Sequence, residues 1–224
     1  MDIELEEMSE FFNSRADRYN TVHVEHIDGG MQSKNIIASF FPEHTKTMID
    51  LGIGTGLELD YIFKRFPDIE VTGLDISENM LRRLKESYPG KNVRLYCESY
   101  LDFDFGSGLY DVALSVMTLH HYSHKAKTDL YRRVRRCIKP NGVYIECDYM
   151  LSDHEYENAQ ETEDFHFAEY ERLKVELDKT DDREYHYDTP CTVSNQKKML
   201  IEAGFSNVRE VWGTKNTTIL IAGV

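Results

Sequence analysis

Residues 48–58 read MIDLGIGTGLE, and this stretch decides the fold. An apolar run that carries one acid, Asp50, breaks into a glycine turn, and a helical pattern follows at once. The three glycines of the turn alternate with other residues and are Gly52, Gly54 and Gly56. A ligand can approach such a turn closely because no Cβ stands in the way. A dinucleotide fingerprint requires Gly-x-Gly-x-x-Gly, but Leu57 stands where its third glycine would be, so the spacing favours another ligand.

A second acid follows the next apolar run. Residues 70–74 read EVTGL and lead into Asp75, 19 residues after Gly56. An acid at the tip of the second strand of a βαβ unit is placed to accept hydrogen bonds from ribose hydroxyls. With both segments in view, the sequence resembles the class I S-adenosylmethionine-dependent methyltransferases: MIDLGIGTG is similar to their first motif, and VTGLDIS at 71–77 to their second. Either motif alone is weakly specific, but the two in this order and at this distance are strongly so.

The rest of the chain alternates between strand and helix patterns joined by short loops, which predicts an α/β, doubly wound sheet. Strands are expected at 47–51, 70–75, 92–97, 110–116, 142–147, 207–213 and 217–223. Helices are expected at 4–19, 31–41, 57–66, 78–88, 124–138 and 194–203, with Ser77 as an N-cap. The resemblance covers about residues 47–224 and implies a seven-stranded, mostly parallel sheet of order 3-2-1-4-5-7-6, with the last strand antiparallel.

One Rossmann-like domain is expected over residues 1–224. Residues 149–190 are too polar for the sheet and predict a mostly helical insertion, with a helix at about 155–177. Its expected buried contacts are Phe165, Phe167, Leu173 and Leu177. Together with the N-terminal helices at 1–41, this insertion is expected to form a helical cap over an acceptor pocket.

The resemblance implies that S-adenosyl-L-methionine is the cofactor. The glycine turn and Asp50 would hold its methionyl end, Asp75 its ribose, and apolar side chains its adenine. The family usually offers an Asp to the adenine amino group after the third strand, but this chain has Ser99 there. The cofactor-binding residues expected on this basis are Tyr19, Asp50, Gly52, Gly54, Gly56, Asp75, Ile76, Met80, Ser99, Tyr100 and Ser115.

A pair of histidines follows the fourth expected strand, where residues 115–122 read SVMTLHHY. Family members often carry a similar segment beside the site of methyl transfer. The enzyme mainly aligns donor and nucleophile and, where needed, removes a proton, which His120 or His121 is suited to do because histidine titrates near neutrality. The alternative, that one of the pair only packs within its loop, carries equal weight. Further candidates for lining the pocket are His23, His26, Asp148, Tyr149, His166 and Tyr170.

Charge and composition limit the classes of molecule that we expect this protein to bind. The net charge is −14, and residues 153–184, with thirteen acids and four basic residues, contribute −9 of it. Such a surface is repelled by nucleic acids and anionic lipids, so we expect neither as a direct partner. No run of 18 apolar residues exists, and the four cysteines show no C-x-x-C spacing. We therefore expect a cytoplasmic protein with no membrane span and no metal site, and a homodimer is left open.

These observations predict a methyltransferase acting on a small-molecule acceptor. Two alternatives are kept. One is a tRNA-modification-related enzyme of the same fold, including those that synthesise a carboxylated form of the cofactor. The other is a non-catalytic module that only binds S-adenosylmethionine. A fold does not name a substrate, and the acceptor and the methylated atom are not predicted.

Overall fold

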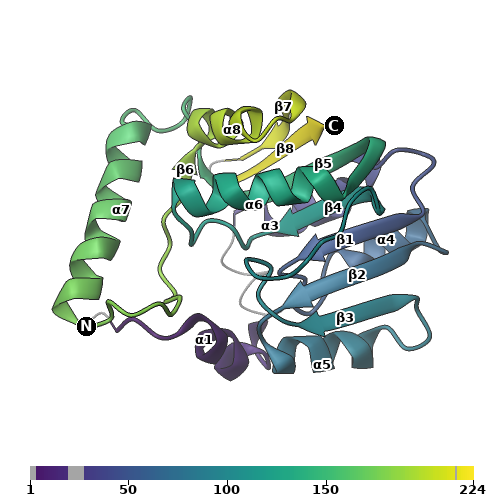
Figure 1. Ribbon diagram of the computed structural model, residues 1–224, viewed down its shortest axis with the longest axis horizontal. Coiled ribbons are helices and arrows are strands. Elements are labelled where there is room, and N and C mark those ends of the chain that lie inside the picture. Colours follow the sequence, from purple (N-terminus) through teal and green to yellow (C-terminus); the bar gives the residue numbers. More distant parts are fainter. Residues whose placement is uncertain (1–3, 20–27, 215) are drawn as a thin grey trace.

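The computed structural model describes residues 4–19, 28–214 and 216–224 (Figure 1). Its strands form one twisted sheet of order β3-β2-β1-β4-β5-β8-β7, with a short β6 pairing with β5 outside this path. The strands are β1 Thr47–Leu51, β2 Glu70–Asp75, β3 Val93–Cys97, β4 Tyr110–Val116, β5 Ile138–Leu151, β6 Cys191–Thr192, β7 Ser206–Gly213 and β8 Thr217–Gly223. With the two-residue β6 set aside, this is the predicted order 3-2-1-4-5-7-6. β8 runs antiparallel to both of its neighbours, as expected for the last strand.

Helices cover both faces of the sheet (Figure 1). They are α1 Met8–Arg15, α3 Gly30–Ile37, the 3₁₀ turn η1 Ala38–Phe40, α4 Leu59–Arg65, α5 Glu78–Ser87, α6 His124–Cys137, α7 Ala159–Glu176 and α8 Val193–Glu202. Apolar residues of α6 and α8 pack on one face, and those of α3, α4 and α5 pack on the other. Met48 and Ile49 on β1 point to opposite faces and are both fully buried, which explains the continuous apolar run there. Burying each such side chain contributes about 1.5–3 kcal/mol.

The first helix is shorter than predicted. The sequence favours a helix over 4–19, but α1 begins at Met8 and ends at Arg15. The segment before it lies along residues 184–186: Met8 N donates to Glu184 O, and His186 N donates to Glu6 O, both over 2.9 Å. Leu5 is buried between Leu173 and Tyr185. These long-range contacts outweigh the local helical preference.

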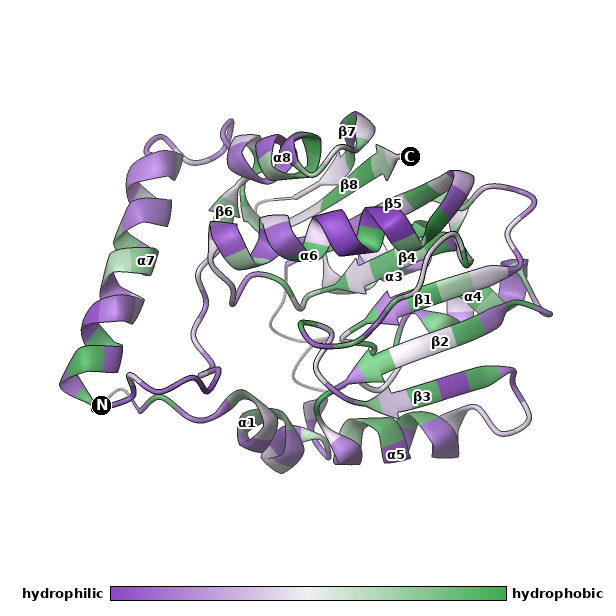
Figure 2. Cartoon of the chain, viewed as in Figure 1, coloured by the Kyte–Doolittle hydropathy of each residue, from purple (hydrophilic) through white to green (hydrophobic). Residues whose placement is uncertain are grey.

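The insertion begins later than predicted, because Tyr149–Leu151 still belong to β5. Helix α7 stands at the side of the molecule, away from the central strands, and is mostly polar (Figures 1 and 2). Leu173 is buried as expected, but Phe165 and Leu177 are 62% and 38% exposed, so the prediction that they are buried was wrong. Only one face of α7 packs against other segments, with Ala159, Glu163 and Leu173 buried there, so most side chains on its other faces are exposed. No helix among the described residues is long and apolar enough to span a membrane.

Candidate active site

The glycine turn after β1 has left-handed backbone at all three glycines, with φ between 54° and 71°. Gly52 N and Ile53 N both donate to Leu74 O, which ties the turn to β2. A Cβ at Gly52 would lie 2.2 Å from Thr118 Oγ1, so this position has no room for a side chain. A Cβ at Gly54 would meet no described atom closer than Gly52 O at 4.0 Å. The backbone is therefore open to a ligand at Gly54.

Asp75 joins this turn to the start of α5. Its Oδ2 accepts a hydrogen bond from Gly54 N and its Oδ1 accepts one from Ser77 N, each over 2.8 Å. Ser77 is the N-cap of α5 as predicted, since its hydroxyl accepts from Met80 N. Burial raises the pKa of Asp75 to about 6, even though both backbone bonds lower it. Each carboxylate oxygen keeps a second acceptor position for a ligand.

Two carboxyl groups lie beneath the turn. Asp50 and Glu58 are 1% and 3% exposed and interact with each other, and Lys34 lies near enough to Glu58 to lower its pKa; apart from this pairing, no described donor satisfies either oxygen of Asp50 or Oε1 of Glu58. Burial raises the pKa of both, that of Asp50 well above its usual range. Glu58 and Lys34 line a hollow together with the three glycines and Tyr19. Buried carboxyl oxygens without a further partner are suited to meet an ammonium group of a ligand.

An inner cavity opens above Gly54. Its lining residues are Met8, Phe12, Tyr19, Gly52, Gly54, Asp75, Ile76, Met80, Tyr100, Met117, Thr118, His121 and Tyr122. Seven predicted cofactor residues are thus brought together here, and Gly56 lines the adjoining hollow. Three are not: Asp50 is buried and lines neither space, the Ser115 hydroxyl bonds Tyr144 in the core over 2.7 Å, and the Ser99 hydroxyl accepts from Leu101 N. Each serine hydroxyl is hydrogen-bonded to a neighbouring group, and neither serine lines the cavity.

A larger outer cavity of 740 Å³ adjoins the inner one. It is lined by Phe11, Phe12, Ser14, Arg15, Asp17, Arg18, Tyr19, Asp28, Met117, His120, His121, Tyr149, His186, Asp188 and Asn216. Phe12, Tyr19, Met117 and His121 line both cavities. Met117 has a φ of 51°, a strained conformation for a side chain of its size, directly after β4. The two cavities therefore meet at the loop that follows β4.

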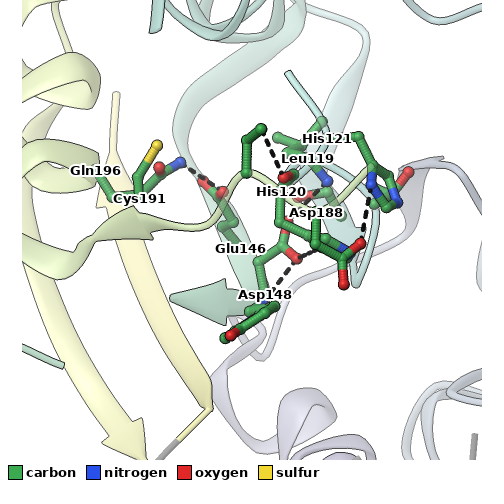
Figure 3. Close-up of polar contacts among 12 residues, drawn as sticks. Leu119, His120, His121, Glu146, Asp148, Asp188, Cys191 and Gln196 are labelled. Atoms are coloured by element: carbon green, nitrogen blue, oxygen red, sulfur yellow. Dashed lines mark hydrogen bonds and ion pairs between the residues drawn. The ribbon is translucent and has the colours of Figure 1, made fainter. Parts of the chain in front are cut away.

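His120 and Asp148 form a buried pair at this junction (Figure 3). His120 Nδ1 lies 2.5 Å from Asp148 Oδ1, and the other Asp148 oxygen accepts from Leu119 N over 2.7 Å. Burial alone would lower the pKa of His120, but the charge and hydrogen bond of Asp148 reverse this and raise it. The same contacts lower the pKa of Asp148 although burial raises it. The ring nitrogen Nε2 of His120 lies 3.6 Å from Asp188 Oδ1.

His121 has a different environment. Its Nδ1 donates to Tyr187 O over 3.1 Å and lies 3.3 Å from Asp188 Oδ1. Burial, followed by the nearby His120 and His186, holds its pKa well below the usual value, so its ring is neutral. Burial likewise lowers the pKa of His186 to about 4. The ligand atoms of His120, His121 and Asp188 lie within 4.8 Å of one another, a spacing that suits a metal ion although the sequence predicted none.

Sequence reasoning missed several lining residues. Phe11 stacks on His186 with ring centroids 3.4 Å apart, and Asp188 faces both histidines of the pair. The sequence signal that could have identified them is a histidine and an acid two residues apart, His186 and Asp188. This pair does not stand out among the many polar residues of the insertion. Of the other candidates, Tyr149 lines the outer cavity, whereas His166 and Tyr170 lie on α7 and line neither cavity. His23 and His26 lie outside the described residues.

Comparison with known proteins agrees with this geometry. Residues 48–142 match the family model described as a methyltransferase domain. The chain is 23% identical to the carboxy-S-adenosyl-L-methionine synthase of Campylobacter fetus, over 78% of this chain and 76% of that protein. It is 24% identical to the phosphoethanolamine N-methyltransferase of Plasmodium falciparum, over 80% of this chain but only 61% of that protein's length.

Among solved structures, the DhpI–SAH complex superposes with a TM-score of 0.69 at 15% identity, over 95% of this chain and 93% of that one. At this identity, the likeness concerns the fold. The matched model identifies residues 48–142 as a methyltransferase domain, and the fold of the described chain is that of this solved methyl-transfer cofactor complex.

Proposed function

We propose that this protein transfers a methyl group from S-adenosyl-L-methionine to a small-molecule acceptor held in the outer cavity. The observation that carries this proposal is the junction of the two cavities beside His120 and His121. The cofactor supplies a methyl group activated by its positive sulfur. The chain itself has to hold the two partners in line, exclude water and accept a proton.

The inner cavity offers complementary groups for each part of the cofactor. Asp75 has acceptor positions for the ribose hydroxyls, and Ile76 and Met80 offer apolar surface for the adenine. Glu58 lines the hollow beside the glycines, and its Oε1 is the oxygen that we expect an ammonium group to satisfy, while Asp50 interacts with Glu58 from a buried position. Gly54 leaves the backbone accessible. Ser99 and Ser115 are left out of the proposed site because their hydroxyls are bonded elsewhere.

His120 is the residue we assign as the proton acceptor. Asp148 fixes the ring through Nδ1, which leaves Nε2 as the nitrogen that faces the outer cavity. The same carboxylate stabilises the imidazolium that forms when His120 takes a proton. His121 is neutral and lines both cavities, so its part is to shape the junction.

The proposal includes a cap over the acceptor, but this cap is formed by fewer segments than the sequence predicted. Phe11, Phe12 and Arg15 of α1 line the outer cavity, and His186 and Asp188 join them from the end of the insertion. Helix α7 supplies none of the lining residues that the structure describes. The four cysteines are unpaired, which supports a reducing compartment such as the cytoplasm.

Synthesis of a carboxylated cofactor is a second candidate, since a relative that aligns with 78% of this chain carries that name. Mass spectrometry of the cofactor products separates the two functions. The purified protein is incubated with S-adenosylmethionine and panels of hydroxyl, amine and carboxylate compounds. Acceptor-dependent S-adenosylhomocysteine, lost in His120→Ala, supports methyl transfer. A cofactor product that gains a carboxyl group, or no turnover despite binding, contradicts it.

A further inference from the structure

Three side chains of metal-binding type converge at a place away from both cavities. They come from three separate segments: His124 is the first residue of α6, Glu163 lies on α7, and Cys191 lies on β6. Their ligand atoms lie within 4.8 Å of one another, and His124 Nε2 is 2.5 Å from Glu163 Oε1. Glu163 and Cys191 are fully buried, whereas the His124 side chain is 44% exposed.

Neighbouring groups hold two of these side chains in place. Glu163 Oε2 accepts a hydrogen bond from Thr192 N over 2.5 Å, and Asn195 Nδ2 lies 3.1 Å from both Glu163 oxygens. Lys127 Nζ donates to Cys191 Sγ over 3.1 Å. Figure 3 shows Cys191 beside Gln196 and apart from His120 and His121. Outer contacts of this kind orient the ligands of protein metal sites.

The donor set identifies the ion. A thiolate, an imidazole and a carboxylate together are typical of Zn²⁺, whereas Mg²⁺ and Ca²⁺ require oxygen ligands. The thiolate and the carboxylate balance the two charges of the ion. The nearby Lys127 ammonium is attracted by two further carboxylates, Glu146 and Asp148. Three protein ligands leave a fourth position for water.

A hollow at the surface reaches one member of the site. A surface hollow of 390 Å³ lies between α6 and α8, and His124, Thr128, Asn195 and Met199 are among its lining residues. His124 is the member of the three that lines this hollow, whereas Glu163 and Cys191 are buried and do not line it.

We propose that His124, Glu163 and Cys191 bind one Zn²⁺ ion that fastens α7 to the sheet domain. Without it, α7 is held by few groups, since its only buried side chains are Ala159, Glu163 and Leu173. Binding converts the Cys191 thiol to a thiolate that bonds the metal, and the proton leaves to solvent. The inference is independent of the proposed methyl transfer, because none of the three residues lines either cavity.

The test uses the full chain, reduced and stripped of metal with a chelator. Zn²⁺ alone is added in competition with a chromophoric chelator, and Co²⁺ is added separately as a spectroscopic probe. We expect one tightly bound equivalent of Zn²⁺ and a thiolate-to-cobalt charge-transfer band. Cys191→Ser should abolish the band and weaken Zn²⁺ binding at least tenfold, while the matched control Cys97→Ser, at an exposed cysteine outside the site, leaves both unchanged.

His124→Ala serves as a second variant, because its half-exposed side chain can be removed with little risk to the fold. It should keep the charge-transfer band and weaken Zn²⁺ binding. Zinc should also raise the Tm of the wild type but not that of Cys191→Ser. The proposal is overturned if Co²⁺ gives no thiolate band, or if Cys191→Ser and the wild type bind Zn²⁺ equally. Either result would mean that any bound metal lies elsewhere, for example at His120, His121 and Asp188.

Discussion

His120 Nδ1 lies 2.5 Å from Asp148 Oδ1, and this contact joins the loop after β4 to the carboxyl-terminal part of β5. The carboxylate holds the ring through Nδ1, which leaves Nε2 3.6 Å from Asp188 Oδ1, and it raises the pKa of the ring against the effect of burial. His121, the next residue, is shifted in the opposite direction. The pKa values of two adjacent histidines are thereby shifted in opposite directions, and their variants should behave differently.

Asp148→Asn should shift the pH dependence of turnover. Only neutral His120 can accept a proton, so turnover rises as the pH passes upward through its pKa. Because Asp148 raises that pKa, removing its charge should lower it, and the midpoint of kcat against pH should move to lower pH by about 1 unit or more. A midpoint identical to that of the wild type would show that another group titrates. His121→Gln, the matched control, should leave the midpoint in place.

His120→Ala and His121→Ala should separate turnover from binding. Loss of the proton acceptor should lower kcat by about 10²–10⁴-fold, with cofactor affinity within a few-fold of the wild type. His121 lines both cavities, so its loss should mainly alter KM and cofactor affinity. Steady-state kinetics and calorimetry on both variants measure this. Turnover that both variants retain in full would remove both histidines as bases.

Gly54→Ala tests where the cofactor approaches the chain. The left-handed backbone should cost about 1–2 kcal/mol of stability, but the new Cβ has room, so the protein should fold. Cofactor affinity should fall at least tenfold, about 1.4 kcal/mol, because the methyl group occupies the open side of the turn. Thermal unfolding and calorimetry check the two effects.

Gly108→Ala is the control for this variant. Its φ is 61° and a Cβ there meets no described atom within 4 Å, so the backbone strain is similar, but the residue lies away from both cavities. Affinity equally reduced in the two variants would assign the loss to strain rather than to contact. Gly52→Ala should be the least stable of the three, because its Cβ would lie 2.2 Å from Thr118 Oγ1.

Cofactor affinity should fall in mild acid. Burial raises the pKa of Asp75 to about 6, so the carboxylate that accepts the ribose hydroxyls becomes protonated as the pH falls through that value. Below it, affinity should drop by about tenfold per pH unit, and above it affinity should be constant. Asp75→Asn should bind about 10–100-fold more weakly at pH 7 and lose this part of the dependence. If Asp75→Asn retains the full dependence, Asp50 and Glu58 are its source.

Strand bounds were predicted most accurately where an apolar stretch of sequence forms a largely buried strand. The bounds of β1, β2 and β4 are as expected, because these strands are buried and end at turns or at the polar residues of the site. Strand β6 was missed because two residues carry no periodicity. The role of Ser115 was misassigned because its partner, Tyr144, lies 29 residues away on the neighbouring strand.

The outer cavity was the part least accessible to prediction. Its wall is made where α1 meets residues 186–188, and the stacking of Phe11 on His186 depends on a contact between distant segments. Asp148 was only one of several candidates until the structure placed it against His120. Sequence pattern located the glycine turn and Asp75 because the chemistry there is local to two strand ends.

Titration calorimetry of the purified protein with S-adenosylmethionine, S-adenosylhomocysteine and NAD in parallel tests the central claim most directly. We predict dissociation constants on the order of micromolar for the first two ligands, weakened in Gly54→Ala and unchanged in Gly108→Ala, and no binding of NAD. Binding of NAD, or no binding of S-adenosylmethionine to the wild type, would contradict the assignment of the glycine turn and Asp75.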